Sequence, residues 1–334
     1  MSDTDYTPPE NRSEIVLLYD ARDCNPNGDP LSSDNRPRID PATDQAIVTD
    51  VRLKRYIRDQ LYADGEPILI QNSSQLGEKP TRERLYDEVA TRMDEGIDPE
   101  RAFLEAATDV RYFGATISVN SDVTEDLPTQ FVGPVQFQTG RSYNPVEVNE
   151  ATQRLTTVIY SSDDAEQGTF ATDQRLQYAL VGFTGVVNEN AATDTRLTQS
   201  DVERLDTLVW RALSNQTMTR SKVGQQPRLY LRVEYVRDDF HIGNLDETFD
   251  MSTEGPLADV RTIKDYAVDI SGFVEQLSNH SEAIETVHVE EDRRMSVTGG
   301  DGETYESVGS AIESVSGISV APIGVYQDVE TAEE

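Results

Sequence analysis

The sequence contains little of the chemistry on which most metal and disulfide sites depend. Cys24 is its only cysteine, and its three histidines, His241, His280 and His288, lie at no metal-ligand spacing. These counts argue against a disulfide framework and against a zinc site, and they fit the reducing cytoplasm. The chain also has no glycine-rich loop that ends in Gly-Lys-Ser or Gly-Lys-Thr. We therefore expect no cofactor and no bound metal.

Long apolar segments are missing as well. The longest candidate, Tyr178–Val187, has ten residues, whereas a membrane-spanning helix needs about 20. Residues 1–13 are polar and acidic, which is not the pattern of a signal peptide. We expect a cytoplasmic protein without membrane contact, whose first 13 residues form a disordered arm.

Lysine is scarce in a chain that is strongly acidic. Of 29 basic residues four are lysines and 25 are arginines, and 62 acidic residues bring the formal net charge to −33. This composition indicates a salt-adapted, haloarchaeal-like source, because the Debye length falls to roughly 3 Å at 1 M salt and distant charges then hardly interact. The net charge reports the habitat and does not exclude a polyanionic partner. Local positive charge becomes the informative feature.

Two segments stay positive against this background. Residues 52–58 hold four basic residues and no acid, and residues 211–237 hold six basic residues and one acid. Their cations are Arg52, Lys54, Arg55 and Arg58 in the first segment, and Arg211, Arg220, Lys222, Arg228, Arg232 and Arg237 in the second. Either segment is a solvated face with surface ion pairs or a site for an anionic ligand.

Helical periodicity places the first segment on an amphipathic helix at 50–62. One face carries Leu53, Tyr56, Ile57, Gln60 and Leu61, and the other carries Lys54, Arg55 and Arg58. Thr49 is in position to cap this helix, and Asp50 complements the helix dipole in its first turn. The helix is expected to pack on a sheet through its apolar face and to present its cations outward.

A long polar loop connects the apolar strand at 14–20 to this helix. It begins with CNPNGDP (24–30), in which the dipeptides Asn25-Pro26 and Asn27-Gly28 favour tight turns. Long connections are often functional, and this one brings Arg36 and Arg38 toward the N-terminal end of the helix. For Asn27 and Gly28 the alternative is an ordinary tight turn without function.

The second positive segment follows another predicted helix, at 200–214, in which Ser200 to Glu203 form a capping-box pattern. Arg220, Ser221 and Lys222 then lie in a polar loop. Hydroxyl and cationic donors together suit a phosphate group. The alternative is that these cations complement the dipole at the end of the helix.

The order of elements predicts an α+β fold. Strands are expected at 14–21, 130–139, 154–160, 176–188 and 228–236, helices at 50–62, 200–214 and 270–282, and a mostly helical stretch from 63 to 108. Strand–helix–strand–strand–helix–strand with insertions is the ferredoxin-like plan, which is also that of RNA-recognition sheets. The aromatic signatures of an ordinary RNA-recognition motif are absent.

Several of these segments together resemble a known family. NPNGDP, NRPRIDPAT with VTDVRLKRYIRD, DVRYFGA, GPVQF and MTRSKVGQQPRLYLRVEY occur in this order from about residue 14 to 240. They resemble the backbone subunit of the CRISPR Cascade surveillance complex, in its type I-B branch. The C-terminal third matches only loosely.

The resemblance implies a non-catalytic protein with a modified RNA-recognition-motif palm. Copies would polymerise head to tail along one CRISPR RNA and present its bases to invading DNA, together with a repeat-processing endonuclease and a subunit that binds the 5′ handle. Its expected parts are a palm at 14–62 and 131–260, a helical insertion at 63–130, a thumb hairpin near 160–174 and an acidic extension at 261–334. The residues expected to contact RNA are Asn25, Asn27, Gly28, Arg36, Arg38, Lys54, Arg55, Arg111, Arg220, Ser221 and Lys222.

Two other functions stay open at this point. Related type III backbone subunits are metal-dependent ribonucleases, and the loop carries carboxylates at Asp20, Asp23, Asp29, Asp34 and Asp40 that suit Mg²⁺. Asp23 or Asp29 would then be essential for cleavage. A purely structural, salt-adapted assembly protein would carry no RNA.

Overall fold

An eight-stranded sheet lies at the centre of the protein. The computed structural model describes residues 6–28, 35–117, 124–149, 154–160, 168–172, 174–217 and 221–326. The strand order is β16-β13-β10-β1-β9-β6-β2, with β5 also pairing with β9. These strands are β1 (Ser13–Cys24), β2 (Gln45–Val48), β5 (Val135–Phe137), β6 (Gly140–Pro145), β9 (Leu176–Val187), β10 (Gln225–Tyr235), β13 (Ile284–Glu291) and β16 (Ser319–Pro322).

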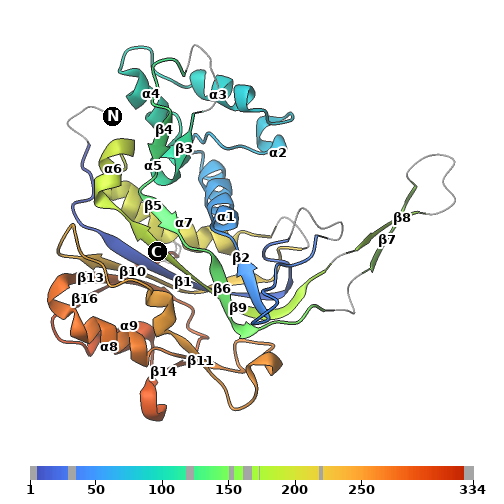
Figure 1. Ribbon diagram of the computed structural model, residues 1–334, viewed down its shortest axis with the longest axis vertical. Coiled ribbons are helices and arrows are strands. Elements are labelled where there is room, and N and C mark those ends of the chain that lie inside the picture. The colour runs from blue at the N-terminus through green and yellow to red at the C-terminus, as the bar shows by residue number, and fades with distance from the viewer. Residues whose placement is uncertain are drawn as a thin grey trace, which may run out of the picture.

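The predicted α+β class is confirmed, because helices and a smaller sheet surround this central one (Figure 1). The helices are α1 (Asp50–Ala63), α2 (Ser73–Leu76), α3 (Arg82–Ala90), α4 (Pro99–Glu105), α5 (Thr108–Phe113), α6 (Glu189–Thr195), α7 (Gln199–Ser214), α8 (Ser271–Asn279) and α9 (Val308–Glu313). The remaining strands are β3 (Gly114–Thr116), β4 (Gln130–Val132), β7 (Arg154–Tyr160), β8 (Gly168–Thr172), β11 (Asp250–Ser252), β12 (Ala267–Asp269), β14 (Val297–Thr298) and β15 (Thr304–Tyr305).

Strand β1 is buried on both of its faces. It is antiparallel to β9 on one side and to β10 on the other. Ile15 and Leu17 point into a core that includes α1 and α7, whereas Val16 and Leu18 point into a core that includes α8 and α9. Because successive side chains of a strand face opposite ways, an unbroken apolar run suits a strand between two layers. Figure 1 shows these helix pairs on opposite sides of the sheet.

Helices α2 to α5 form an insertion with a core of their own, together with the β3–β4 pair. The rings of Tyr86, Phe103 and Phe131 stack in a row in this core, with centroids 6.1 and 5.7 Å apart. The sequence predicted one strand over 130–139, but the structure divides it into β4 and β5 at Gly133. A Cβ atom at Gly133 would lie 2.0 Å from the backbone carbon of Phe113, so only glycine fits this crossing.

Strands β7 and β8 pair with each other and extend away from the body as a two-stranded arm (Figure 1). The arm is inserted between β6 and β9. Its residues 161–167 and 173 lie outside the described residues. The thumb predicted near 160–174 falls on this part of the chain, and its first strand begins at Arg154.

Helix α7 begins earlier than the sequence indicated. Its N-cap is Thr198, which shares a capping box with Asp201, so the predicted box at Ser200 to Glu203 is wrong by two residues. The error has a physical cause: Ser200 and Thr198 are both capping residues with an acid three positions on. The helix at 50–62 is confirmed as α1, and the strand at 176–188 as β9.

A buried ion pair joins α7 to the sheet. Arg232, 1% exposed, donates from Nε and from a terminal nitrogen to the two carboxylate oxygens of Asp206, at 2.8 and 2.9 Å. The hydroxyl of Tyr230 donates to the same carboxylate at 2.8 Å. Removal of Asp206 would leave the buried Arg232 with one acidic partner, Glu234 at 3.2 Å, and such a loss is costly.

Asp206→Ala should therefore lower the free energy of unfolding by about 3–5 kcal/mol, as measured by urea denaturation at constant molar salt. The control is Asp239→Ala, which breaks the exposed pair of Arg237 and Asp239 at the end of β10 and should leave stability nearly unchanged. Equal effects of the two substitutions would contradict the importance of burial.

Candidate nucleic-acid interface

The loop after β1 is held in place by both positive segments of the sequence. The amide of Asn25 donates to the carbonyl of Ser221 at 2.8 Å. Lys222 donates from Nζ to the carbonyl oxygens of Asn25 and Pro26. From α1, the hydroxyl of Tyr56 donates to the same Pro26 carbonyl at 3.0 Å. The loop, the N-terminal half of α1 and the start of β10 thus meet at one place, although they are up to 200 residues apart in sequence.

Buried polar atoms without a partner gather around this loop. Within the described ranges, Asn25 Oδ1, Asn27 Nδ2 and Arg38 Nε are buried and make no hydrogen bond. Asn25 and Asn27 are 1% and 3% exposed. Native structures leave few such atoms unsatisfied, so three in one loop region indicate a surface that is completed by a ligand.

Helix α1 points its N-terminus at the same loop. Its N-cap, Thr49, makes no side-chain capping bond; its hydroxyl donates instead to Asn27 Oδ1 at 3.4 Å. One turn on, Arg52 lies over the ring of Tyr56, with 5.9 Å between guanidinium carbon and ring centroid. In the part of the chain that the structure describes, Arg52 has no carboxylate partner. Free backbone N–H groups and the helix dipole make such an end a site for anions.

This environment lowers the pKa of Lys222. Burial, and then the nearby charge of Arg52, lower its pKa to about 8, because both disfavour the ammonium form. Two cations that repel each other without an intervening acid are costly to hold together. An anion between them would relieve that repulsion. We name Asn25, Asn27, Arg38, Arg52 and Lys222 the RNA face, after the ligand that the sequence led us to expect.

The structure brings together only part of the predicted site. Asn25, Asn27, Arg38 and Lys222 belong to the RNA face, and Ser221 contributes its backbone. Gly28 pairs with Pro37 in an isolated β-bridge. A Cβ atom at Gly28 would lie 2.0 Å from Asn35 Oδ1, at the end of a side chain that can rotate away, so this contact alone does not require a glycine. Arg220 lies outside the described residues.

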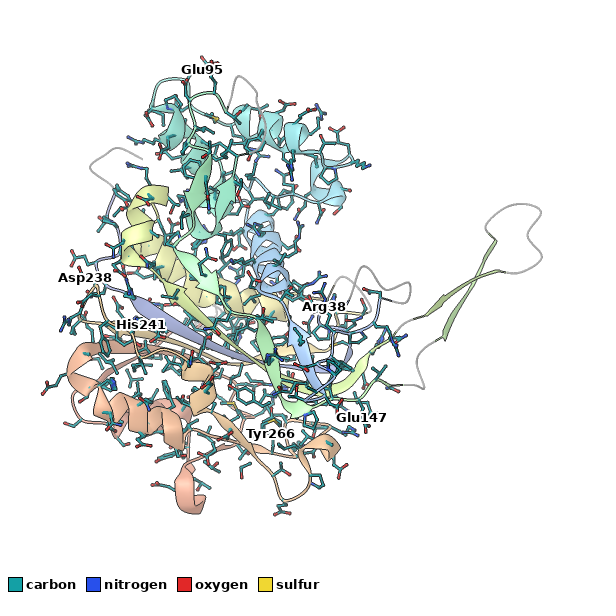
Figure 2. The ribbon with its side chains drawn as sticks, in the orientation of Figure 1. Arg38, Glu95, Glu147, Asp238, His241 and Tyr266 are labelled. Atoms are coloured by element: carbon teal, nitrogen blue, oxygen red, sulfur yellow. The ribbon has the colours of Figure 1, made fainter. Side chains whose placement is uncertain are left out.

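The other predicted cations are engaged in contacts within the protein. Lys54 pairs with Asp50 at 3.3 Å, and Arg55 pairs with Asp59. Arg111 makes a two-pronged ion pair with Asp201 at 3.0 and 3.2 Å and is 15% exposed, which is the arrangement of a structural residue. Arg36 donates to Gln174 at 2.9 Å. Figure 2 shows Arg38 on the side of the body from which the arm extends.

Sequence reasoning omitted Arg52 and Tyr56 from the site. Both were visible in the pattern. Arg52 belongs to the first positive segment and lies one turn inside the helix start, and Tyr56 follows it by four residues, so the two share a face. Tyr56 was assigned to the apolar face of the helix, and that assignment left out its hydroxyl, which donates a hydrogen bond to the loop.

The loop aspartates do not form a metal site in the described ranges, where no group of three or more potential metal-ligating side chains occurs. Asp20 is buried and accepts hydrogen bonds from Arg228 at 2.6 Å and from Tyr178 at 3.1 Å. Burial raises the pKa of Asp20 in spite of these partners. Asp40 pairs with Arg141 at 2.8 Å. Asp29 and Asp34 lie outside the described residues.

Within the described residues, no helix combines the length and apolar character that crossing a membrane would require.

Comparison with known proteins identifies the family of the chain. The family model described as CRISPR-associated protein Cas7 matches residues 11–271. A CRISPR-associated protein Cas7 of Haloferax volcanii is 46% identical over 309 residues, which cover 87% of this chain and 90% of the relative. The chain belongs to the Cas7 family.

Two solved structures were also matched at low similarity. A CRISPR RNA-guided surveillance complex in a pre-nicking state contains a chain with a TM-score of 0.47 and 16% identity, over 91% of this chain and 98% of that one. A second surveillance complex gives a TM-score of 0.45 and 15% identity, over 91% and 97%.

The RNA face should bind single-stranded RNA in a pH-dependent way. A phosphate favours the charged form of Lys222, whose pKa is about 8 in the free protein. Affinity should therefore be highest below pH 8 and fall by about tenfold between pH 7 and pH 9. Fluorescence anisotropy at constant ionic strength measures this affinity at each pH.

Two variants test the assignment of this pH dependence. Lys222→Arg should flatten the profile, because arginine does not titrate in this range. Lys54→Arg changes a lysine of α1 that is paired with Asp50, and it should leave the profile as in the wild type. A profile that persists in Lys222→Arg would show that another group is responsible.

Proposed function

We propose that the protein is a backbone subunit of a CRISPR RNA-guided surveillance complex and that it holds the guide RNA on the RNA face. Membership of the Cas7 family supports the role. The observation that carries the binding site is the group of unpaired cations and unpartnered buried amides around one loop, in a chain of net charge −33. Acidic surfaces elsewhere would keep RNA from binding at random.

The arrangement of the palm supports this proposal. In the order β10-β1-β9-β6 each strand is antiparallel to its neighbours. The connection β1–α1–β6 crosses β9, and the connection β9–α7–β10 crosses β1. This order supports the ferredoxin-like plan with insertions that we propose for the palm. The helices α1 and α7 cover one face, and the RNA face lies at the end of β1 where α1 begins. The arginine-rich, lysine-poor composition and the Haloferax relative agree with a salt-adapted type I-B protein.

A guide scaffold must grip the backbone of the RNA and leave the base edges free. Phosphate contacts position a nucleic acid without reading its sequence, and pairing with the target then supplies specificity. Each ion pair with a phosphate loses strength in salt. Hydrogen bonds from Asn27 Nδ2 and the N-terminal amides of α1 to phosphates, and from a ribose hydroxyl to Asn25 Oδ1, would therefore carry much of the affinity in a salt-rich cytoplasm.

Assembly would use the arm formed by β7 and β8. Copies would line up head to tail along one RNA, with the arm of each as the thumb that reaches the next. The repeat-processing endonuclease and the subunit that binds the 5′ handle would occupy the ends, and target DNA would join through the guide. The subunit itself would not be catalytic: Asp20 is engaged by Arg228 and Tyr178, and Asp23 by Asn149.

Purification from the native host in molar salt tests the function directly. Sequencing of the accompanying nucleic acid should yield short RNAs that carry repeat and spacer sequence, protected by several copies of the chain. Partner subunits without RNA would contradict the guide-scaffold function. Degradation of complementary RNA on addition of Mg²⁺ or Mn²⁺ would support a ribonuclease instead.

Arg52 offers a sharper test of the RNA face. Arg52→Gln should weaken binding of single-stranded RNA equally for all sequences and reduce the slope of log affinity against log salt by about 0.7, the value of one phosphate contact. The control Arg237→Gln removes an exposed arginine at the end of β10. Equal slopes for the wild type and Arg52→Gln would exclude Arg52 from the interface.

A further inference from the structure

Both ends of the RNA-binding loop are attached to the base of the arm. At the start of the loop, Asn149 donates from Nδ2 to Asp23 Oδ1 at 3.1 Å, and Arg175 donates to the carbonyl oxygen of Asp23 at 3.1 Å. At the other end, Arg36 donates from Nε to Gln174 at 2.9 Å. Asn149 precedes the arm, and Gln174 and Arg175 follow it. One aspartate thus contacts the chain where it enters the arm and where it leaves.

Asp23 has an unusual backbone conformation for this task. Its φ is +47°, in the left-handed region that disfavours most side chains and that Asp and Asn tolerate. This turn points its carboxylate and its carbonyl at the arm base while Cys24 still pairs with Leu176. The side chain of Asp23 is 58% exposed, so it is not required to fill a core.

The arm needs such support because it is only a two-stranded ribbon. Ribbons of this kind are marginally stable alone, and they gain order from what they pack against. The residues at its base pair with each other through the amide of Asn149 and the carbonyl of Arg175, at 2.7 Å. Contacts from Asp23 and Arg36 are therefore in a position to set the direction in which the whole arm leaves the body.

We propose that Asp23 is a positioning residue that couples the RNA face to the arm, so that RNA on the loop and contact with a neighbouring copy stabilise each other. The proposal rests on the proposed function, in which RNA occupies the loop and the arm reaches the next copy. RNA bound at Asn25 and Asn27 would hold Asp23 and Arg36 in place and, through them, the arm. Binding of successive copies to one RNA should then be cooperative.

The test compares two single-stranded RNAs. An oligouridine of about 8 nucleotides has room for one copy, and one of about 40 nucleotides has room for several. Mass photometry in molar salt gives the number of copies on the long RNA, and anisotropy gives the affinity for the short one. Asp23→Ala should lower the cooperativity factor by about fivefold or more and leave the affinity for the short RNA unchanged.

Three further variants control the result. Asp23→Asn keeps both the acceptor oxygen and tolerance of the left-handed conformation, and it should restore cooperativity. Asn149→Ala should reproduce the loss seen with Asp23→Ala, and the double variant should add little to it. Asp44→Ala changes another exposed aspartate with φ of +56°; its backbone carbonyl accepts a hydrogen bond from the Val146 amide, which the substitution keeps, and it should behave as the wild type.

The outcomes separate this inference from the proposed function. No binding of either RNA by the wild type would overturn both. Cooperative assembly of the wild type and of Asp23→Ala alike would overturn the inference and leave the function intact. An equal loss of affinity for the short RNA would show that Asp23 acts in RNA binding itself, which also contradicts coupling through the arm. Equal melting temperatures of the variants confirm that each is folded.

Discussion

The burial of β1 on both faces is the constraint on which the rest of the structure depends. Ile15 and Leu17 anchor the layer of α1 and α7, and Val16 and Leu18 anchor the C-terminal layer. A strand held from both sides and by two neighbours cannot shift its register, because a slip of one residue would exchange the two faces. The end of β1 is therefore a fixed point from which the loop that carries Asn25 and Asn27 leaves the sheet. The same fixed point lies beside the base of the arm.

The distribution of paired and unpaired arginines separates structural charge from functional charge. Three of the six cations of the second positive segment serve the fold: Arg211 pairs with Asp64, Arg228 bridges Asp20 and Asp292, and Arg232 pairs with Asp206. Arg38 and Arg52 have no acidic partner in the described ranges. Other described cations, such as Lys264 and Arg293, also lack an ion pair, so what distinguishes Arg38 and Arg52 is their place beside one loop that holds unpartnered buried polar atoms.

Much of the architecture could be predicted from the sequence, because it depends on local patterns. The apolar run of β1, the two faces of α1 and the length of β9 each appear in one window of the chain. The short family motifs predicted a backbone subunit of a CRISPR surveillance complex, and the comparisons show that the chain belongs to the Cas7 family. The candidate site was harder to predict. Whether Arg111 contacts RNA or an internal acid depends on Asp201, 90 residues away, and the role of Tyr56 depends on a loop 30 residues before it. Contacts over such separations leave no periodic signal in a single sequence.

The register of β1 also has a consequence for biosynthesis. Ile15 pairs with Gly185 and with Arg232, so the central strand emerges from the ribosome long before either neighbour exists. At ordinary rates of translation the interval to β10 is roughly 10–40 s, during which an apolar strand with two open edges is exposed. Salting-out conditions strengthen the association of such segments. Until β9 and β10 have been made, the first strands of neighbouring unfinished copies on a polysome are therefore free to pair with one another.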